Sequence, residues 1–404
     1  MRKAASNKSK GEQPGSAVRL AGRMQQLAPY LFAELDRKKK EALAKGVDVI
    51  SLTIGDPDLP TPGAIVEAGQ KALADPANHR YPPYAGSPTF KAAAAAWLKK
   101  RFGVVLDPEK EILALVGTKE GIFHLPFVLV DPGEVVLVPD PGYPVYAIAT
   151  RLAGGEVHWM PLREQNGFLP DLEAIPAAVA RKARMLWVNY PNNPTAAVAD
   201  LAFFEGAVAF CRENGCVLCV DSAYSEVAFD GYRAPSALQV PGGKEVAVEF
   251  HSFSKTYNMC GWRVGFAAGC PEVVSALGRL KNNLDSGVFQ AVQVAAVAAM
   301  ALWPSHLPEV VDVYRRRRDV LVEGLRRAGL NPPNPKATFY VWMPVPGGDD
   351  QAFANALIEK AGVLVAPGSG FGPSGKGYVR FALTVGEERL REAARRIQQA
   401  KLGG

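Results

Sequence analysis

The chain has 404 residues, of which 48% are hydrophobic and 21% charged, and its 46 Lys and Arg against 40 Asp and Glu give a net charge of +6. This composition is ordinary for a globular enzyme, and the length is enough for two domains. The small net charge argues against nucleic-acid binding, and the longest apolar run, residues 288–303, is too short to span a membrane.

The N-terminus and the cysteines indicate a cytoplasmic protein. Residues 1–18 are rich in Lys, Ser and Gly, lack the apolar segment of an export signal and are expected to be disordered. The cysteine number, five, is odd. Cys211, Cys216 and Cys219 are spaced as in one iron–sulfur pattern. A strand over 216–220 would, however, point Cys216 and Cys219 to opposite faces. Free core cysteines are favoured, and no metal site is predicted.

The first elements in chain order are a helix over 27–44 and a short strand over 49–54 that breaks at residues 55–57 (GDP). Helices and apolar strands then alternate. This alternation predicts an α/β fold with a mostly parallel sheet covered by helices on both faces. The expected strands are 112–116, 134–138, 184–188, 216–220 and 247–250, and the expected helices include 89–101 and 201–213.

The pattern changes after residue 304, where a long basic helix (308–328), two strands (339–343 and 378–383) and two further helices (353–361 and 387–401) suggest a smaller α+β domain. We therefore expect residues 19–60 and 305–404 to form the small domain and 61–304 the large one. Four consecutive arginines, 315–318, lie in the long helix and are expected on a solvated face.

The residues with the strongest chemical signal are 251–265 (HSFSKTYNMCGWRVG), which follow the strand over 247–250. Lys255 would lie just past a strand end, where open α/β sheets bind ligands. A partly desolvated lysine can form a Schiff base, while Ser252, Ser254 and Arg263 supply donors for a phosphate. Lysine and phosphate site together are the anchors of pyridoxal phosphate. The alternative is a surface loop without a role.

Three further strand ends carry candidate residues. Thr118 lies in residues 117–121 (GTKEG), which join a strand to a helix and suit an anion. Tyr143 in residues 139–146 (PDPGYPVY) can stack on a pyridine ring. Asn193 in residues 189–195 (NYPNNPT) can donate to a phenolate oxygen. Taken singly, each is also typical of an ordinary turn.

Two charged residues lie in apolar strands, where burial is costly without a partner. Asp221, in residues 220–224 (VDSAY), suits a protonated pyridine nitrogen. Tyr224 can form a hydrogen bond to the same phenolate oxygen as Asn193. Arg380, in residues 378–383 (YVRFAL), suits a substrate α-carboxylate. A helix cap and an internal salt bridge are the respective alternatives. Residues 368–372 (GSGFG) are expected to be a flexible loop, since they lack the context of a dinucleotide site.

These motifs, with residues 29–34 (PYLFAE) and 55–62 (GDPDLPTP), resemble those of class I/II aminotransferases of fold type I over nearly the whole chain from Arg23 onward. The closest resemblance is to LL-diaminopimelate aminotransferases. It implies a pyridoxal 5'-phosphate enzyme and a homodimer with shared active sites. The implied reaction is ping-pong amino transfer between LL-2,6-diaminopimelate and 2-oxoglutarate in lysine biosynthesis. Cys260, where a threonine is expected, and Thr118, where a serine is frequent, depart from the pattern.

The resemblance also implies a role for each matching residue. Lys255 carries the cofactor and shuttles the proton, Asp221 pairs the pyridinium, and Tyr143 stacks on the ring. The residues expected at the phosphate or the phenolate oxygen are Thr118, Lys119, Asn193, Tyr224, Ser252, Ser254, Arg263 and, from the partner subunit, Tyr81. The residues expected at the substrate are Tyr30, Gly55, Lys119, Tyr143, Asn193 and Arg380.

Other functions stay open at this point. An aspartate, alanine or aromatic aminotransferase would use the same residues, and so would a pyridoxal-phosphate β-lyase. A binding protein that keeps the fold without turnover is disfavoured because Lys255 is intact.

Overall fold

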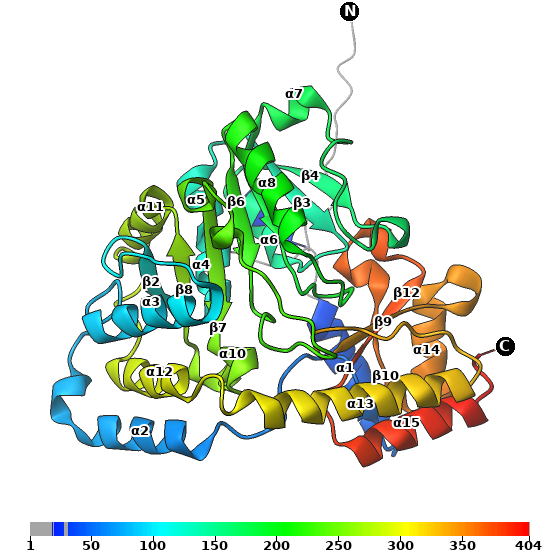
Figure 1. Cartoon of the computed structure of the whole chain (residues 1–404). Helices are drawn as coiled ribbons and strands as arrows, with labels where there is room; N and C mark the ends of the chain where they lie inside the picture. Colours follow the sequence, from blue (N-terminus) through cyan, green and yellow to red (C-terminus); the bar gives the residue numbers. More distant parts are fainter. Residues whose placement is uncertain (1–17, 19, 28–30, 404) are drawn as a thin grey trace, which may run out of the picture.

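A computed structural model describes residues 18, 20–27 and 31–403 (Figure 1). The disordered tail expected over 1–18 falls outside this range except for Val18. Tyr30, expected at the substrate, also lies outside the described residues.

The larger sheet has seven strands in the described part of the chain, in the order β2-β8-β7-β6-β5-β3-β4. Every neighbouring pair is parallel except the two pairs made by β8. The α/β fold with a mostly parallel sheet is therefore confirmed. The strands are β2 (Ile112–Leu115), β3 (Val135–Asp140), β4 (Glu156–Pro161), β5 (Ala183–Val188), β6 (Val217–Asp221), β7 (Ala247–Ser252) and β8 (Gly265–Gly269). The sequence pattern did not predict β4 and β8.

Alternate residues of these strands pack into two different cores, because successive side chains point to opposite faces of a sheet. Leu218 and Val220 of β6 join one core, and Cys219 between them joins the other. The helices that supply the first core are α2 (Gly63–Ala74), α3 (Pro88–Phe102), α8 (Leu201–Asn214) and α12 (Gln290–Leu302). The second core includes α4 (Thr118–His124), α5 (Pro126–Leu129), α6 (Val145–Leu152) and α11 (Pro271–Lys281). Three short helices, α7 (Ala177–Ala180), α9 (Gly243–Val246) and α10 (Phe253–Thr256), lie between strands.

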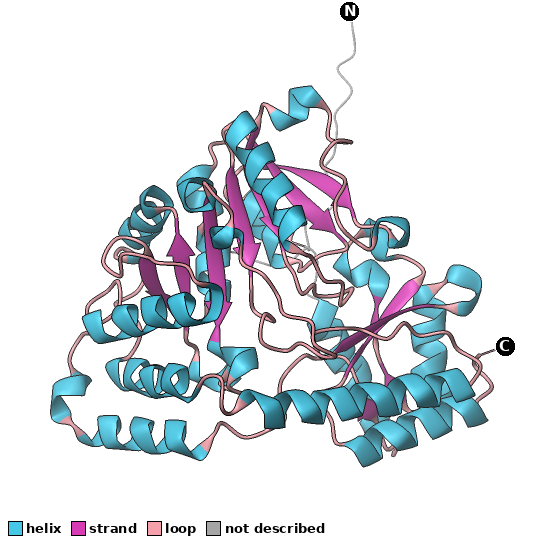
Figure 2. Cartoon of the chain, viewed as in Figure 1, coloured by secondary structure: helices cyan, strands magenta, loops and turns pink. Residues whose placement is uncertain are grey.

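A second group of elements packs beside the large sheet (Figures 1 and 2). Its antiparallel sheet has the order β11-β12-β9, and a two-stranded sheet pairs β1 with β10. This group matches the α+β character expected after residue 304. Its strands are β1 (Ile50–Ser51), β9 (Tyr340–Pro344), β10 (Val363–Leu364), β11 (Ala366–Pro367) and β12 (Tyr378–Ala382), and its helices are α1 (Leu31–Ala44), α13 (Leu307–Arg327), α14 (Asp350–Ala361) and α15 (Glu387–Gln399).

The expectation of one solvated face for arginines 315–318 is wrong for two of them. Arg317 and Arg318 are buried, and each forms a two-nitrogen pair with an aspartate, Asp58 and Asp230 respectively. Arg315 and Arg316 stay largely accessible and contact Asp312 on their own helix. The reason is geometric: with 3.6 residues per turn, four consecutive residues go around the whole helix and cannot share a face.

No single helix among the described residues is long and apolar enough to cross a membrane. The pair α12 and α13 passes the same test jointly, with an angle of 82° between the two helices.

Candidate active site

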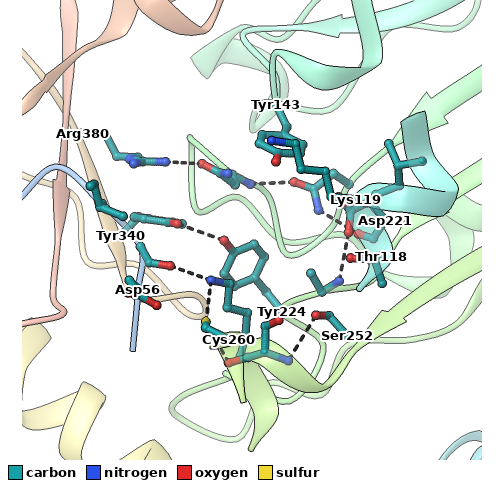
Figure 3. A pocket seen from close by; sticks show the side chains of 18 of the residues that line it. Asp56, Thr118, Lys119, Tyr143, Asp221, Tyr224, Ser252, Cys260, Tyr340 and Arg380 are labelled. Atoms are coloured by element: carbon teal, nitrogen blue, oxygen red, sulfur yellow. Dashed lines mark hydrogen bonds between the residues drawn. The ribbon is translucent and has the colours of Figure 1, made fainter. Parts of the chain in front are cut away.

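A cavity of about 430 Å³ lies at the edge of the large sheet where the parallel strands end, facing the second group of elements. Strand ends of this kind bind ligands in open α/β folds. Every residue predicted for the site that the structure describes lines the cavity, except Tyr81. Figure 3 shows Arg380 on one side and Asp221 with Thr118 on the other. The cavity also contacts residues that the sequence did not single out, namely Ile54, Asp56, Ile122, Asn189, Ala223 and Tyr340.

Lys255 lies on α10, directly after β7, so the strand end places its side chain in the cavity. Its Nζ donates a hydrogen bond to the backbone carbonyl oxygen of Gly55 at 2.6 Å and lies 3.4 Å from Cys260 Sγ. Burial raises the pKa of the Cys260 thiol, so the sulfur faces the lysine as a neutral group. The amine is thus held at a fixed place in the cavity wall.

Asp221 ends β6, and its carboxylate is buried. Tyr146 donates a hydrogen bond to Oδ2 at 2.8 Å, and the backbone N–H of Ala223 donates to Oδ1 at 3.2 Å. Burial raises the pKa of Asp221 to about 6 in spite of these bonds. These two donors, a phenol and a backbone amide, carry no charge. A buried acid of this kind fits a protonated ring nitrogen.

The residues predicted at a phosphate gather at one end of the cavity. Thr118, Ser252 and Ser254 bring hydroxyls, and Lys119 and Arg263 bring positive charge. Desolvation, with a smaller effect from Arg263, lowers the pKa of Lys119. Gly117 has a φ of +72°, and a methyl group there would lie within 3.0 Å of the Arg263 guanidinium. This arrangement fits a phosphate dianion.

The amide and phenol groups on the adjacent strand ends are fixed by hydrogen bonds. The Asn193 N–H donates to Oδ1 of Asn189 at 2.7 Å, and Asn189 Nδ2 donates to the backbone oxygen of Asp221 at 2.7 Å. The hydroxyls of Tyr224 and Tyr340 lie 2.9 Å apart. Burial, reinforced by Tyr340, raises the pKa of Tyr224 well above its usual value. Tyr224 therefore keeps its hydroxyl proton at neutral pH.

Arg380 reaches the cavity from β12, in the second group of elements. Its guanidinium lies between the rings of Tyr340 and Phe371, 4.1 Å and 4.6 Å from their centroids. Nη1 donates to Asn193 Oδ1 at 2.6 Å, and Nη2 donates to the backbone oxygen of Thr53 at 2.5 Å. These two acceptors are uncharged, and a carboxylate in the cavity has the shape that a guanidinium binds best.

Two aromatic residues of the site, Tyr146 and Tyr340, were missed because each lies in an apolar run that is typical of a core. Tyr81 has an exposed fraction of 81% and does not line the cavity. Its expected contact with the phosphate of a partner subunit stays a prediction.

A lysine at a strand end, a buried acid that fits a ring nitrogen and a cationic group of residues that fits a phosphate, all on an α/β sheet, are the features of a pyridoxal-phosphate-dependent enzyme of fold type I. The family description "Aminotransferase class I and II" matches residues 47–397. The chain belongs to this family and is a pyridoxal-phosphate-dependent aminotransferase.

The relatives are similar in sequence to this protein over nearly the whole chain. The LL-diaminopimelate aminotransferase of Desulforudis audaxviator is 56% identical, with 94% of this chain and 97% of the relative covered. The enzyme of the same name from Syntrophobacter fumaroxidans is 53% identical, with 94% and 98% covered. Among solved structures, substrate-bound BacF from Bacillus subtilis is 38% identical, has a TM-score of 0.92, and covers 96% of this chain and 99% of its own.

Proposed function

We propose that this aminotransferase transfers an amino group between LL-2,6-diaminopimelate and 2-oxoglutarate, as a step of lysine biosynthesis. The observation that carries the proposal is the 56% identity to a relative named for this substrate, which extends over 97% of that relative. The family match over residues 47–397 includes every segment that lines the cavity.

In this proposal the chain's residues divide the work of the reaction. Arg380 binds the α-carboxylate, and Asn193 orients the guanidinium through its 2.6 Å contact. Lys255 would take the proton from the substrate α-carbon and act as its carrier in the 1,3-proton transfer. Bound pyridoxal phosphate supplies an electron sink for the broken C–H bond. Asp221 holds the ring nitrogen protonated, and Tyr224 with Asn193 contacts the phenolate oxygen. Thr118, Ser252, Ser254 and Arg263 would bind the phosphate, and Lys119 would border it.

The far end of LL-2,6-diaminopimelate carries both an ammonium and a carboxylate, so its pocket must offer both signs of charge. Lys119 and Asp56 both line the cavity and supply one charge of each sign. We assign the distal carboxylate to Lys119 and the distal ammonium to Asp56. The Asp56→Asn variant should then lose affinity for LL-2,6-diaminopimelate while its KM for glutamate is unchanged.

The test of the proposal is a substrate panel with the purified holoenzyme. We expect glutamate to form from LL-2,6-diaminopimelate and 2-oxoglutarate with a kcat/KM at least tenfold above that for aspartate, alanine or phenylalanine. The Lys255→Ala variant is the negative control. Preference for another amino donor would overturn the substrate assignment, and release of pyruvate and ammonia from a cysteine conjugate would indicate a β-lyase.

We also propose that the active unit is a homodimer. Large apolar side chains are exposed on two loops that touch each other, where Gly287 packs against Tyr84. Tyr81, Tyr84, Leu284 and Phe289 are the exposed residues of this surface, and burying them offers a favourable free energy. Light scattering should give twice the mass of one chain, and an active monomer would contradict the proposal.

The domain limits, 19–60 with 305–404 against 61–304, are part of the same proposal. They are supported by the separate hydrophobic core that the small domain forms, although Tyr224, Val227 and Phe229 of the large domain pack into that small-domain core. A cytoplasmic location stays a prediction that cell fractionation can test.

A further inference from the structure

The segment 368–375 consists of two short turns, η7 (Gly368–Phe371) and η8 (Pro373–Gly375), and it includes residues 368–372, for which the sequence predicts a flexible loop. It connects β11 to β12 and packs against the turn that follows β3 in the large sheet. The backbone N–H of Gly142 in that turn donates to the oxygen of Phe371 at 2.9 Å. Tyr143, the predicted ring-stacking residue, is the next residue after Gly142.

Asp140, the last residue of β3, makes the main polar contact with this segment. Its carboxylate is 3% exposed and accepts three hydrogen bonds from Ser374: two from the N–H, at 3.1 Å to each oxygen, and one from Oγ at 2.7 Å. A buried carboxylate is costly unless donors of this kind compensate the lost water. Gly372 has a φ of +135°, and a methyl group there would lie within 3.0 Å of Asp140 Oδ1. The segment therefore fits closely around this carboxylate.

The other side of the segment contacts the substrate-binding arginine. The Phe371 ring lies against the Arg380 guanidinium, with 4.6 Å from the ring centroid to Cζ. Trp342 packs edge-on against Phe371 at 6.1 Å between centroids. Because Phe371 is buried, a displacement of the segment must move the ring, and the guanidinium then loses one of its two aromatic walls.

We propose that Asp140 is a positioning residue for substrate binding: through Ser374 it holds the segment 368–375 in place, so that Phe371 fixes Arg380 in the orientation that binds the α-carboxylate. The inference rests on the proposed role of Arg380. Asp140 itself does not line the cavity, and its effect on the substrate passes through the segment.

The experiment compares four single variants as holoenzymes. Asp140→Ala removes the acceptor, Ser374→Ala removes one donor, and Gly372→Ala introduces a methyl group that collides with the carboxylate. Gly377→Ala is the matched control, since Gly377 also has a positive φ (+88°) but its nearest atom would be 3.6 Å away. For Asp140→Ala and Gly372→Ala we expect KM for both substrates to rise about tenfold with kcat within about threefold of wild type. Ser374→Ala should show a smaller rise, and the control none.

Two further readouts separate positioning from general damage. The affinity of the cofactor-loaded enzyme for 2-oxoglutarate, measured by calorimetry without an amino donor, should weaken by the same factor as KM. Hydrogen exchange of the peptides that contain Gly142 and Ser374 should become faster in the Asp140→Ala holoenzyme and not in the Gly377→Ala holoenzyme.

Faster exchange with an unchanged KM and unchanged 2-oxoglutarate affinity would reduce Asp140 to a structural residue and overturn the proposal. Unchanged exchange would overturn the anchoring itself. If Asp140→Ala does not fold, Ser374→Ala and Gly372→Ala decide the same questions. Failure of the proposed function would instead appear in the wild type as absent turnover, and 2-oxoglutarate affinity would still test Asp140.

Discussion

Replacing Asp221 by Asn should make the cofactor-free protein more stable at pH 8. The same replacement should abolish most of the activity of the holoenzyme. The pKa of Asp221 is about 6 in the folded chain, against 3.8 for an ordinary aspartate, because burial penalises the charged form. The neutral acid is thus favoured by the fold. The contribution of the protonated Asp221 side chain to the stability of the fold is complete below about pH 4 and is lost as the pH rises through 6.

The magnitude follows from the difference between the two pKa values. A shift of about 2 units corresponds to about 3 kcal/mol of destabilisation when the carboxylate is fully ionised at pH 8, and to less than about 1 kcal/mol at pH 4. Asn is neutral at both pH values. It can keep one acceptor for Tyr146, and the other lost hydrogen bond costs about 1 kcal/mol. The cofactor-free Asp221→Asn protein should therefore gain about 2 kcal/mol at pH 8.

The assay is urea unfolding of both cofactor-free proteins at several pH values between 4.5 and 8. The stability difference should grow with pH, and adding pyridoxal phosphate should reverse the order because only the carboxylate can pair with the ring nitrogen. A stability difference that does not change with pH would show that Asp221 is not a strained acid in the empty site, and the reasoning would fail.

Three further predictions concern the same cavity. Lys255→Ala should lower glutamate formation by at least about 10³-fold, since the proton carrier is lost; turnover within tenfold of wild type would contradict its role. Arg380→Lys should lower kcat/KM about 10–100-fold, because an ammonium cannot form the two-nitrogen contact with a carboxylate; a steady-state assay showing an unchanged value would refute it. Gly117→Ala should weaken pyridoxal phosphate binding about tenfold in a fluorescence titration, through collision with Arg263 at a positive φ. Gly133→Ala is the control, since Gly133 has a φ of +87° and no atom within 4 Å of an added methyl group, and this variant should bind pyridoxal phosphate as well as wild type. Equal weakening by Gly117→Ala and Gly133→Ala would indicate backbone strain alone and would contradict the collision with Arg263.

The charged part of the site can be predicted from the sequence. Lys255, Asp221 and Arg380 each stand next to or inside an apolar strand, where a charge is costly and requires a reason. Since parallel strands end at one edge of the sheet, the order of strands and motifs along the chain is enough to bring residues at several strand ends to one place.

The aromatic and long-range parts could not be predicted in the same way. Tyr340 and Tyr146 lie in runs of apolar residues, where an aromatic side chain is typical of the core. The burial of Arg317 and Arg318 was not predicted, because the aspartates that pair with them, Asp58 and Asp230, come from distant parts of the chain. Local patterns carry no information on such pairs, which only the tertiary fold brings together.

The pairing of Arg317 with Asp58 also bears on how the chain folds during synthesis. The two residues are 259 positions apart, and the neighbouring strand β1 pairs with β10 at Val363. Asp58 and β1 are therefore synthesised well before Arg317 and β10. The large sheet can form before these contacts are made. Contacts of such sequence separation slow folding and leave surface exposed in the meantime. We therefore expect the N-terminal wall of the active site, including Gly55 and Asp56, to be among the last parts of the enzyme to reach its native structure.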